Sequence, residues 1–140
     1  QGRSTRAGVP MTLTGVPYGP YTATSIEQIS NNNTFLNVAE GTYTVSTNQP
    51  RYLNVAGIPV EIKAGKVTLN RLELRGGNAK WNDSNIDILD AVLVGTTFGA
   101  SGSSYDGDVN FDGKVSIQDL ALVGGNYGLT STAAYGTWRP

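Results

Sequence analysis

A ten-residue segment that occurs twice constrains this chain more than any other feature. Residues 86–95 align with residues 115–124 at an offset of 29 positions, and both copies end in glycine. In each copy an aspartate, Asp90 or Asp119, precedes a run of apolar residues. Aspartate suits the positive end of the helix dipole, and glycine commonly ends a helix. The repeat therefore predicts two short helices, each preceded by its own loop.

The loop before the second helix has the spacing of an EF-hand calcium loop. Residues 108–119 place Asp108, Asn110 and Asp112 at alternate positions, then Gly113, with Asp119 in place of glutamate at the twelfth position. A hard cation such as Ca²⁺ takes about six to eight oxygen ligands, and the chain needs a sharp bend to wrap around it. The pattern predicts a calcium site. The alternative, a solvated turn-rich loop, requires the match to arise by chance.

The loop before the first helix is less regular. Counting back from Asp90, Ser84 takes the place of the bend glycine, and Asn78 reaches position 1 only if the loop holds one extra residue. The third ligand is open among Lys80, Trp81 and Asn82. An ammonium repels a cation, which favours Asn82 or a water. The candidate ligands of this first site are Asn78, Asn82, Asp83, Asn85, Asp87 and Asp90. We expect two bound calcium ions, with a vacant structural first loop as the alternative.

Two loops, each followed by one helix and preceded by none, resemble a type I dockerin over about residues 76–135. Residues 107–115 and the helix start 119–123 carry the resemblance. It implies that the second loop binds calcium through Asp108, Asn110, Asp112, the carbonyl of Lys114, and Asp119. It also implies a cohesin-type module as partner, bound at loop positions 10 and 11. These positions are Ile88, Leu89, Ile117 and Gln118. Packing against the companion repeat is the alternative role of these apolar residues.

The first half of the chain predicts strands and no helix. Short β-branched or alternating runs are separated by turn residues, as in an all-β sandwich. Residues 41–45 resemble a signature strand of the carboxypeptidase-regulatory-like (transthyretin-like) and collagen-adhesin B-type sandwiches. The predicted strands are Pro10–Thr14, Tyr21–Ile26, Thr34–Val38, Thr42–Thr47, Arg51–Val55, Ile58–Ile62 and Val67–Leu74. The predicted fold class is thus two domains. Residues 1–75 form an immunoglobulin- or transthyretin-like β-sandwich, and residues 76–140 form a small α dockerin-like domain with two EF-hand-type loop–helix repeats.

Charge and composition narrow the function. Residues 1–82 carry eight basic and four acidic side chains, whereas the remainder carries two basic side chains and seven aspartates. The net charge of −1 gives no reason to expect nucleic acid as a partner. The absence of cysteine and histidine removes disulfides, thiolate and imidazole ligands and the usual general base. No apolar run reaches the roughly 18 residues of a membrane span.

These observations predict a binding module and not an enzyme. We expect a calcium-dependent protein–protein interaction module at the C-terminus of a larger secreted protein, which it anchors to a scaffold or cell surface. The module is expected to be monomeric alone. The alternative is a calcium-rigidified structural stalk or cell-surface module without a cohesin partner. The tail aromatics Tyr135 and Trp138 are expected to fold back near Trp81.

Overall fold

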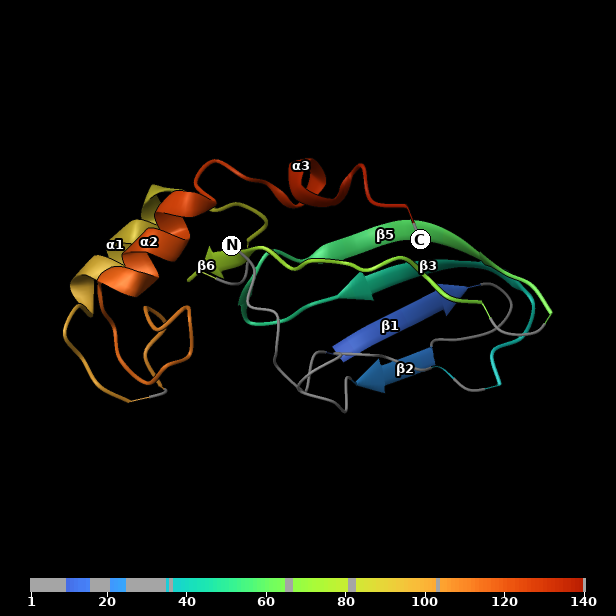
Figure 1. Cartoon of the computed structure of the whole chain (residues 1–140), viewed down its shortest axis with the longest axis horizontal. Helices are drawn as coiled ribbons and strands as arrows, with labels where there is room; N and C mark the ends of the chain where they lie inside the picture. Colours follow the sequence, from blue (N-terminus) through green and yellow to red (C-terminus); the bar gives the residue numbers. More distant parts are fainter. Residues whose placement is uncertain are drawn as a thin grey trace. The chain divides into compact units, whose positions relative to one another are not determined.

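The computed structural model describes residues 10–15, 21–24, 35, 37–64, 67–80, 83–102 and 104–139 (Figure 1). The order of the elements is β1 (Pro10–Gly15), β2 (Tyr21–Thr24), β3 (Gly41–Thr47), β4 (Arg51–Tyr52), β5 (Val55–Ile62), β6 (Gly76–Asn78), α1 (Ile88–Thr96), α2 (Ile117–Gly125) and α3 (Ser131–Tyr135). Among the described residues, no helix is long and apolar enough to cross a membrane.

Contacts divide the chain into two compact units, each built from separated segments. The helical unit contains Gln49–Leu53 and Leu74–Ala134. The sheet unit contains the described residues of Ser4–Asn48 and Asn54–Glu73, together with the tail that starts at Tyr135. The chain therefore enters the helical unit briefly at residues 49–53, returns to the sheet unit, and enters the helical unit again at residue 74.

The sheet unit is built on one antiparallel sheet with the order β2-β1-β3-β5. In β3, alternate residues point to the same face, and Tyr43, Val45 and Thr47 are buried on it. Val45 lies opposite Leu13 of β1, and Tyr43 lies opposite Val60 of β5. Leu13, Tyr43, Val45 and Val60 form the buried core of this unit. Non-local pairing of apolar residues on one face thus holds the sheet together.

The C-terminal tail belongs to the sheet unit. Trp138 packs against its core, and the indole Nε1 donates to the carbonyl of Arg71 at 3.2 Å. One residue further, the carbonyl of Arg139 accepts from Asn70 Nδ2 at 3.0 Å. The tail does fold back, as expected, but onto residues 70 and 71. Trp81, the predicted contact, lies outside the described residues.

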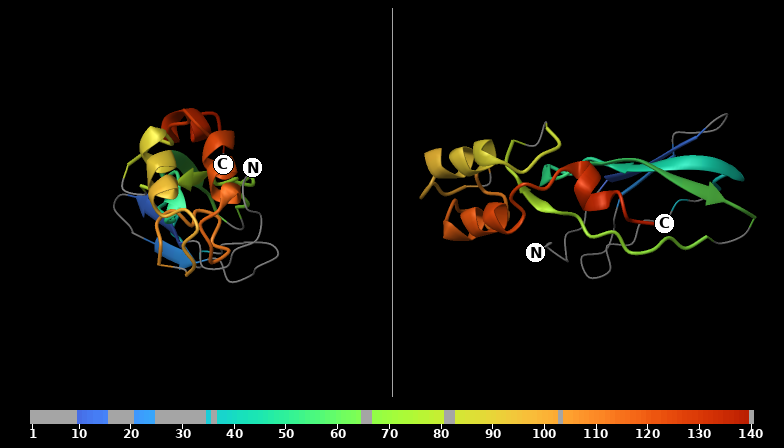
Figure 2. Two further views of the ribbon diagram at one scale, coloured as in Figure 1. Left: turned by 90° about the vertical axis from the view of Figure 1, so that its left-hand side faces the viewer. Right: turned by 90° about the horizontal axis from the view of Figure 1, so that it is seen from above.

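The helical unit contains a second, two-stranded sheet of β4 and β6, which pairs Arg51 with Asn78. The helix α2 packs on β6, and α1 and α2 lie side by side (Figure 2). Gly77 of β6 has a φ of +108°, and a Cβ added there would lie 3.1 Å from the carbonyl oxygen of Leu122. Glycine is required there by both backbone conformation and close approach to α2. Asn126 Nδ2 also donates to the carbonyl of Gly76 at 2.7 Å in the interior.

The fold class predicted from the sequence is wrong. The described part of the chain consists mainly of small β-sheets with three short helices, and it is not an all-β sandwich followed by an α domain with two EF-hand-type repeats. Residues 67–75 form no strand, although Leu69 packs on the core of the sheet unit. Alternation of apolar and polar residues indicates that one side of an extended segment is buried, but it does not show that the segment pairs with another strand. Moreover, β4 and β6 belong to the same unit as α1 and α2.

The packing of Trp138 generates a stability prediction. Replacing Trp138 with alanine is expected to lower the free energy of unfolding of the sheet unit by about 1–3 kcal/mol, because a partly buried aromatic side chain is lost. Trp138→Phe retains the ring and should cost less. The measurement is urea unfolding followed by circular dichroism, with Tyr127→Ala as a control, since Tyr127 is exposed in the helical unit. Equal stability of Trp138→Ala and the unmodified chain would show that the tail is not anchored.

Candidate metal centre

The two copies of the sequence repeat exchange backbone hydrogen bonds. The amide of Gly99, which follows α1, donates to the carbonyl of Val115 at 2.8 Å, and the amide of Gly128, which follows α2, donates to the carbonyl of Ile86 at 2.8 Å. In return, the amide of Ile86 donates to the carbonyl of Leu129, and the amide of Val115 donates to the carbonyl of Ala100, both at 2.9 Å. Ile86 and Val115 are buried. The sequence repeat is therefore also a structural repeat, and reciprocal backbone hydrogen bonds join its two copies.

Each helix begins with the same capping arrangement. The side chains of Asp87 and Ser116 are the N-caps and accept from the amide two residues further along the chain. In return, Asp90 accepts from the amide of Asp87 at 2.7 Å, and Asp119 accepts from the amide of Ser116 at 2.8 Å. This reciprocal pattern is a capping box, with aspartate in place of the usual glutamate. The helices thus begin two residues before Asp90 and Asp119.

The second loop brings its predicted side-chain ligands together. One oxygen of Asp108 accepts from the amide of Asp112 at 3.1 Å, and the other accepts from the amide of Gly113 at 3.0 Å. Asp119 Oδ1 accepts from the amide of Asn110 at 3.1 Å, so the end of the loop is tied to its third position. Asn110 Nδ2 donates to Asp112 Oδ2 at 3.0 Å. Asp108 and Asp119 are fully buried, whereas Asp112 is exposed.

The predicted ligand atoms of this loop are chemically suited to a hard cation. The predicted ligands are three carboxylates, one side-chain amide and the carbonyl of Lys114, all of them oxygen donors, which calcium prefers. A carboxylate oxygen that accepts one hydrogen bond keeps a further lone pair for a cation. Within the described ranges, no group of three or more Asp, Glu, His or Cys side chains forms a ready metal cluster. In this structure the loop is closed by its own hydrogen bonds.

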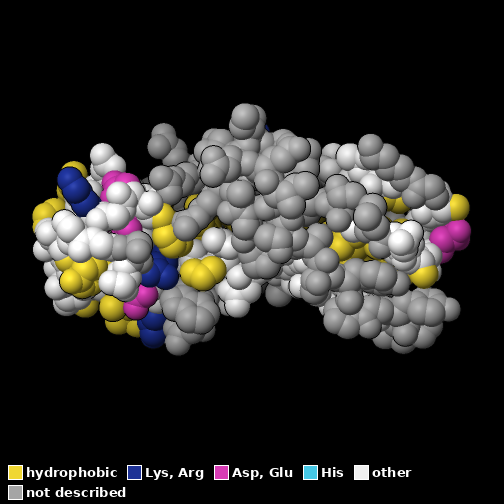
Figure 3. All heavy atoms as spheres, turned by 90° about the horizontal axis from the view of Figure 1, so that it is seen from below, with side chains coloured by type: hydrophobic (Ala, Val, Ile, Leu, Met, Phe, Trp, Pro, Cys, Tyr) yellow, Lys and Arg dark blue, Asp and Glu magenta, His cyan; other side chains and the backbone are white. Residues whose placement is uncertain are grey.

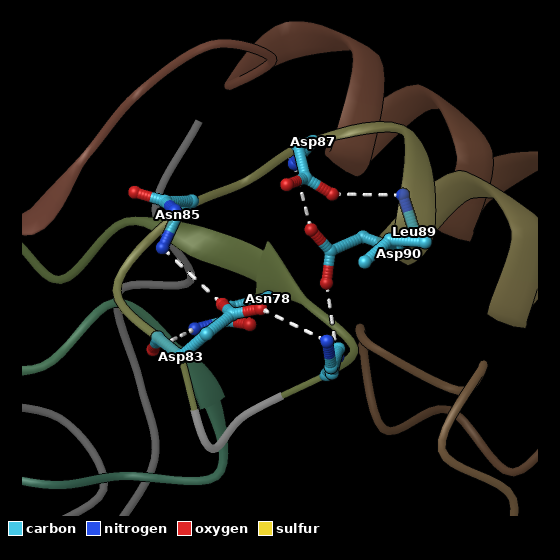
Figure 4. Close-up of polar contacts among 7 residues, drawn as sticks. Asn78, Asp83, Asn85, Asp87, Leu89 and Asp90 are labelled. Carbon is cyan, nitrogen blue, oxygen red and sulfur yellow. Dashed lines mark hydrogen bonds and ion pairs between the residues drawn. The ribbon is translucent and has the colours of Figure 1, made fainter.

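The first loop contains a buried oxygen atom without a hydrogen-bond donor. Asn78 is fully buried, and its Nδ2 donates to the carbonyl of Asp83 at 3.0 Å (Figure 4). Its Oδ1 has no hydrogen-bond partner. Leaving a buried polar atom unsatisfied costs about 1–3 kcal/mol. Asp90 is buried in the same loop, and Asp83 accepts from the amide of Asn85 at 3.2 Å. A cation bound among these oxygens would satisfy Asn78, so the residues present fit a calcium ion here too.

Backbone hydrogen bonds align the two loops at their third position. The amide of Lys80 donates to Asp90 Oδ1 at 2.9 Å, as the amide of Asn110 does to Asp119. Lys80 therefore occupies the place of Asn110, and its Nζ lies 3.9 Å from Asp83 Oδ2. Asn82 and Trp81, the other candidates for the third position, lie outside the described residues. An ammonium beside Asp83 competes with a bound ion, which makes the first loop the poorer site.

The predicted partner residues lie in the first turns of α1 and α2 and are exposed. The exposed fractions are 60% for Ile88, 44% for Leu89 and 68% for Ile117, and Gln118 is exposed as well. Figure 3 shows apolar side chains next to charged ones over the part of the molecule that holds these helices. Sequence reasoning missed four further exposed hydrophobic side chains among the described residues of the helical unit, Val92, Phe98, Tyr105 and Tyr127. The repeat aligns Phe98 with Tyr127, and this was a usable signal.

Burial raises the pKa of Asp90 above the ordinary value of an aspartate. Hydrogen bonds from the amides of Lys80 and Asp87 oppose this shift, and the charges of Asp83 and Asp87 add to it. The folded chain therefore holds a proton on Asp90 at a pH where the unfolded chain has released it. A cation in the loop would favour the charged form instead.

This shift generates a pH prediction for the metal-free protein. As the pH rises from the ordinary pKa of aspartate through the raised pKa of Asp90, the folded state binds more protons than the unfolded state, so the free energy of unfolding falls. Denaturant unfolding of resin-stripped protein between about pH 4 and pH 7 measures this dependence. Asp90→Asn is expected to remove this part of the dependence. Identical pH profiles for the variant and the unmodified chain would contradict it.

Comparison with known proteins shows a similarity of fold. No family model and no curated protein matches the chain. Two crystal structures from Acetivibrio cellulolyticus match, described as an N-terminal and a C-terminal interface mutant of a type II cohesin–X–dockerin complex. In each case the TM-score is 0.61 and the identity is 24%, over 90% of this chain and 84% of the other. At this identity the likeness shows a shared fold, and it extends beyond residues 76–140 alone.

Proposed function

We propose that this chain is a calcium-dependent protein–protein interaction module that binds a cohesin-type partner as part of a secreted protein held at a scaffold or cell surface. The observation that carries the proposal is a duplicated arrangement. In each copy a buried carboxylate, Asp90 or Asp119, closes an oxygen-rich loop and begins a helix that exposes Ile88 or Ile117.

Calcium supplies a positive charge for the buried carboxylates of the second loop. Asp108 and Asp119 are buried in one loop, and a buried charge is costly unless it is paired or bound to a metal. The seven aspartates of the chain all lie in residues 83–119, so mutual repulsion opposes the closed loops when no cation is bound. Binding of calcium to the folded form alone stabilises that form by mass action. The first turns of α1 and α2 are then held in place by the metal.

The apolar face supports a protein partner over a purely structural role. Ile88 and Leu89 are adjacent exposed residues at the start of α1, and Ile117 is exposed at the start of α2. Exposed apolar patches mark interaction sites. A calcium-rigidified stalk would need these side chains to be covered. The two structures that share the fold are described as complexes that contain a cohesin and a dockerin, and this supports a cohesin as the occupant.

The calcium part is tested by calorimetric titration of calcium into metal-free protein. We expect two bound ions for the unmodified chain and one for Asp112→Ala, because Asp112 contributes only to the second loop. Glu61→Ala removes an exposed carboxylate of the sheet unit and is expected to keep both ions. One ion in the unmodified chain and none in Asp112→Ala would restrict calcium to the second loop. The absence of any binding would contradict the proposal.

The partner part is tested by binding of type I and type II cohesin modules to the calcium-loaded chain. The double variant Ile88→Ser, Ile117→Ser is expected to weaken binding by about 10- to 100-fold, because truncating buried anchors of an interface removes most of its energy. Its calcium stoichiometry should be unchanged. Val67→Ser is the matched control, since Val67 is an exposed apolar residue of the sheet unit. A calcium-loaded chain that binds no cohesin would contradict the partner assignment.

A further inference from the structure

Arg51 connects the second loop to a distant part of the sequence. It lies in β4, in the short segment Gln49–Leu53 that joins the helical unit. Its side chain is only 11% exposed, and Nη2 lies 3.0 Å from Asp106 Oδ1. The same nitrogen donates to the carbonyl of Tyr105 at 3.2 Å. The guanidinium carbon lies 5.4 Å from the ring centroid of Phe111, a distance at which a cation–π contact is favourable.

Phe111 is placed where its backbone controls the second loop. It stands between the candidate ligands Asn110 and Asp112 and has a φ of +59°. Residues other than glycine adopt this left-handed region rarely, and only when their surroundings hold them there. Arg51 has a φ of +68° and is also strained. Two strained residues thus meet in one contact, at the turn between Asn110 and Asp112.

The backbone of the same arginine reaches the first loop. In the sheet of β4 and β6, Arg51 lies opposite Asn78. Asn78 is the buried first-loop residue whose Oδ1 lacks a hydrogen-bond partner. A single residue therefore contacts the first loop through its main chain and the second loop through its guanidinium. Arg51 thus links the two loops directly, without an intermediate side chain.

We propose that Arg51 is a positioning residue that holds the second loop in its calcium-binding conformation and couples the two calcium sites. Filling the first loop fixes Asn78 and, through β4, the position of the guanidinium against Phe111. The second loop then binds calcium more tightly. This inference rests on the proposed function, because it requires calcium in both loops. Arg51 binds no calcium itself.

An electrostatic role and a positioning role of Arg51 predict opposite changes in the calcium affinity of the second loop when Arg51 is replaced. A guanidinium near a cation repels it, so loss of the positive charge alone would raise the calcium affinity of the second loop. The ion pair with Asp106 already offsets that charge. Loss of the contact with Phe111 instead releases the turn and lowers the affinity. The sign of the change in affinity therefore distinguishes a positioning role from an electrostatic one.

The first experiment is calorimetric titration of calcium into Arg51→Gln, Arg51→Lys and the control Arg71→Gln, with the second site identified as the one that Asp112→Ala removes. We expect about a tenfold loss of second-site affinity for Arg51→Gln, which corresponds to about 1.4 kcal/mol. Arg51→Lys keeps the charge but not the planar fork, and is expected to lose affinity in part. Arg71→Gln removes an exposed arginine of the sheet unit and should change nothing.

The coupling is tested by a double-mutant cycle with Asn78→Ala, which disables the first loop. In the chain with Arg51, Asn78→Ala is expected to lower the second-site affinity about fivefold, within the usual range of coupling between sites. In Arg51→Gln it should leave the second-site affinity unchanged. An unchanged or higher affinity in Arg51→Gln, or equal effects of Asn78→Ala in both backgrounds, would overturn the inference. Absence of calcium binding in the unmodified chain would overturn the proposed function instead.

Discussion

The helical unit depends on the burial of Asp90 and Asp119. Each carboxylate accepts a backbone amide from its own helix start and another from the third position of its loop. A buried carboxyl group that accepts two such bonds fixes the helix and the loop relative to each other. The reciprocal hydrogen bonds of Ile86 and Val115 then join the two copies. Disorder in one loop is therefore expected to destabilise the helix that follows it and also the other copy of the repeat.

The sequence predicted local features of this unit well and non-local ones poorly. The repeat located α1 and α2, since helix starts and ends depend on nearby residues such as Asp87 and Ser116. It did not reveal that residues 49–53 join the unit, because pairing of Arg51 with Asn78 depends on tertiary contacts. The predicted fold class was wrong for the same reason. The run 67–74 has the pattern of a strand, yet these residues do not form a strand.

The candidate site shows the same division between local and non-local information. Spacing alone grouped Asp108, Asn110, Asp112 and Asp119, which the structure joins by hydrogen bonds. Spacing left the third position of the first loop open, because an inserted residue shifts the alignment. Only the hydrogen bond from the amide of Lys80 to Asp90 aligns the two loops there. Arg51 was missed because no motif connects it with the loop that it contacts.

In the proposed function, the positions of Ile88 and Ile117 make metal binding and partner binding interdependent. Ile88 and Ile117 are the first residues of their helices, two positions before Asp90 and Asp119. Both ends of a helix fray readily, and the first turn is held here by the capping carboxylates. A cation that holds these carboxylates in place also holds the apolar side chains in one arrangement, which lowers the entropy cost of docking. In the proposed function, calcium thus controls recognition of a partner that it never contacts.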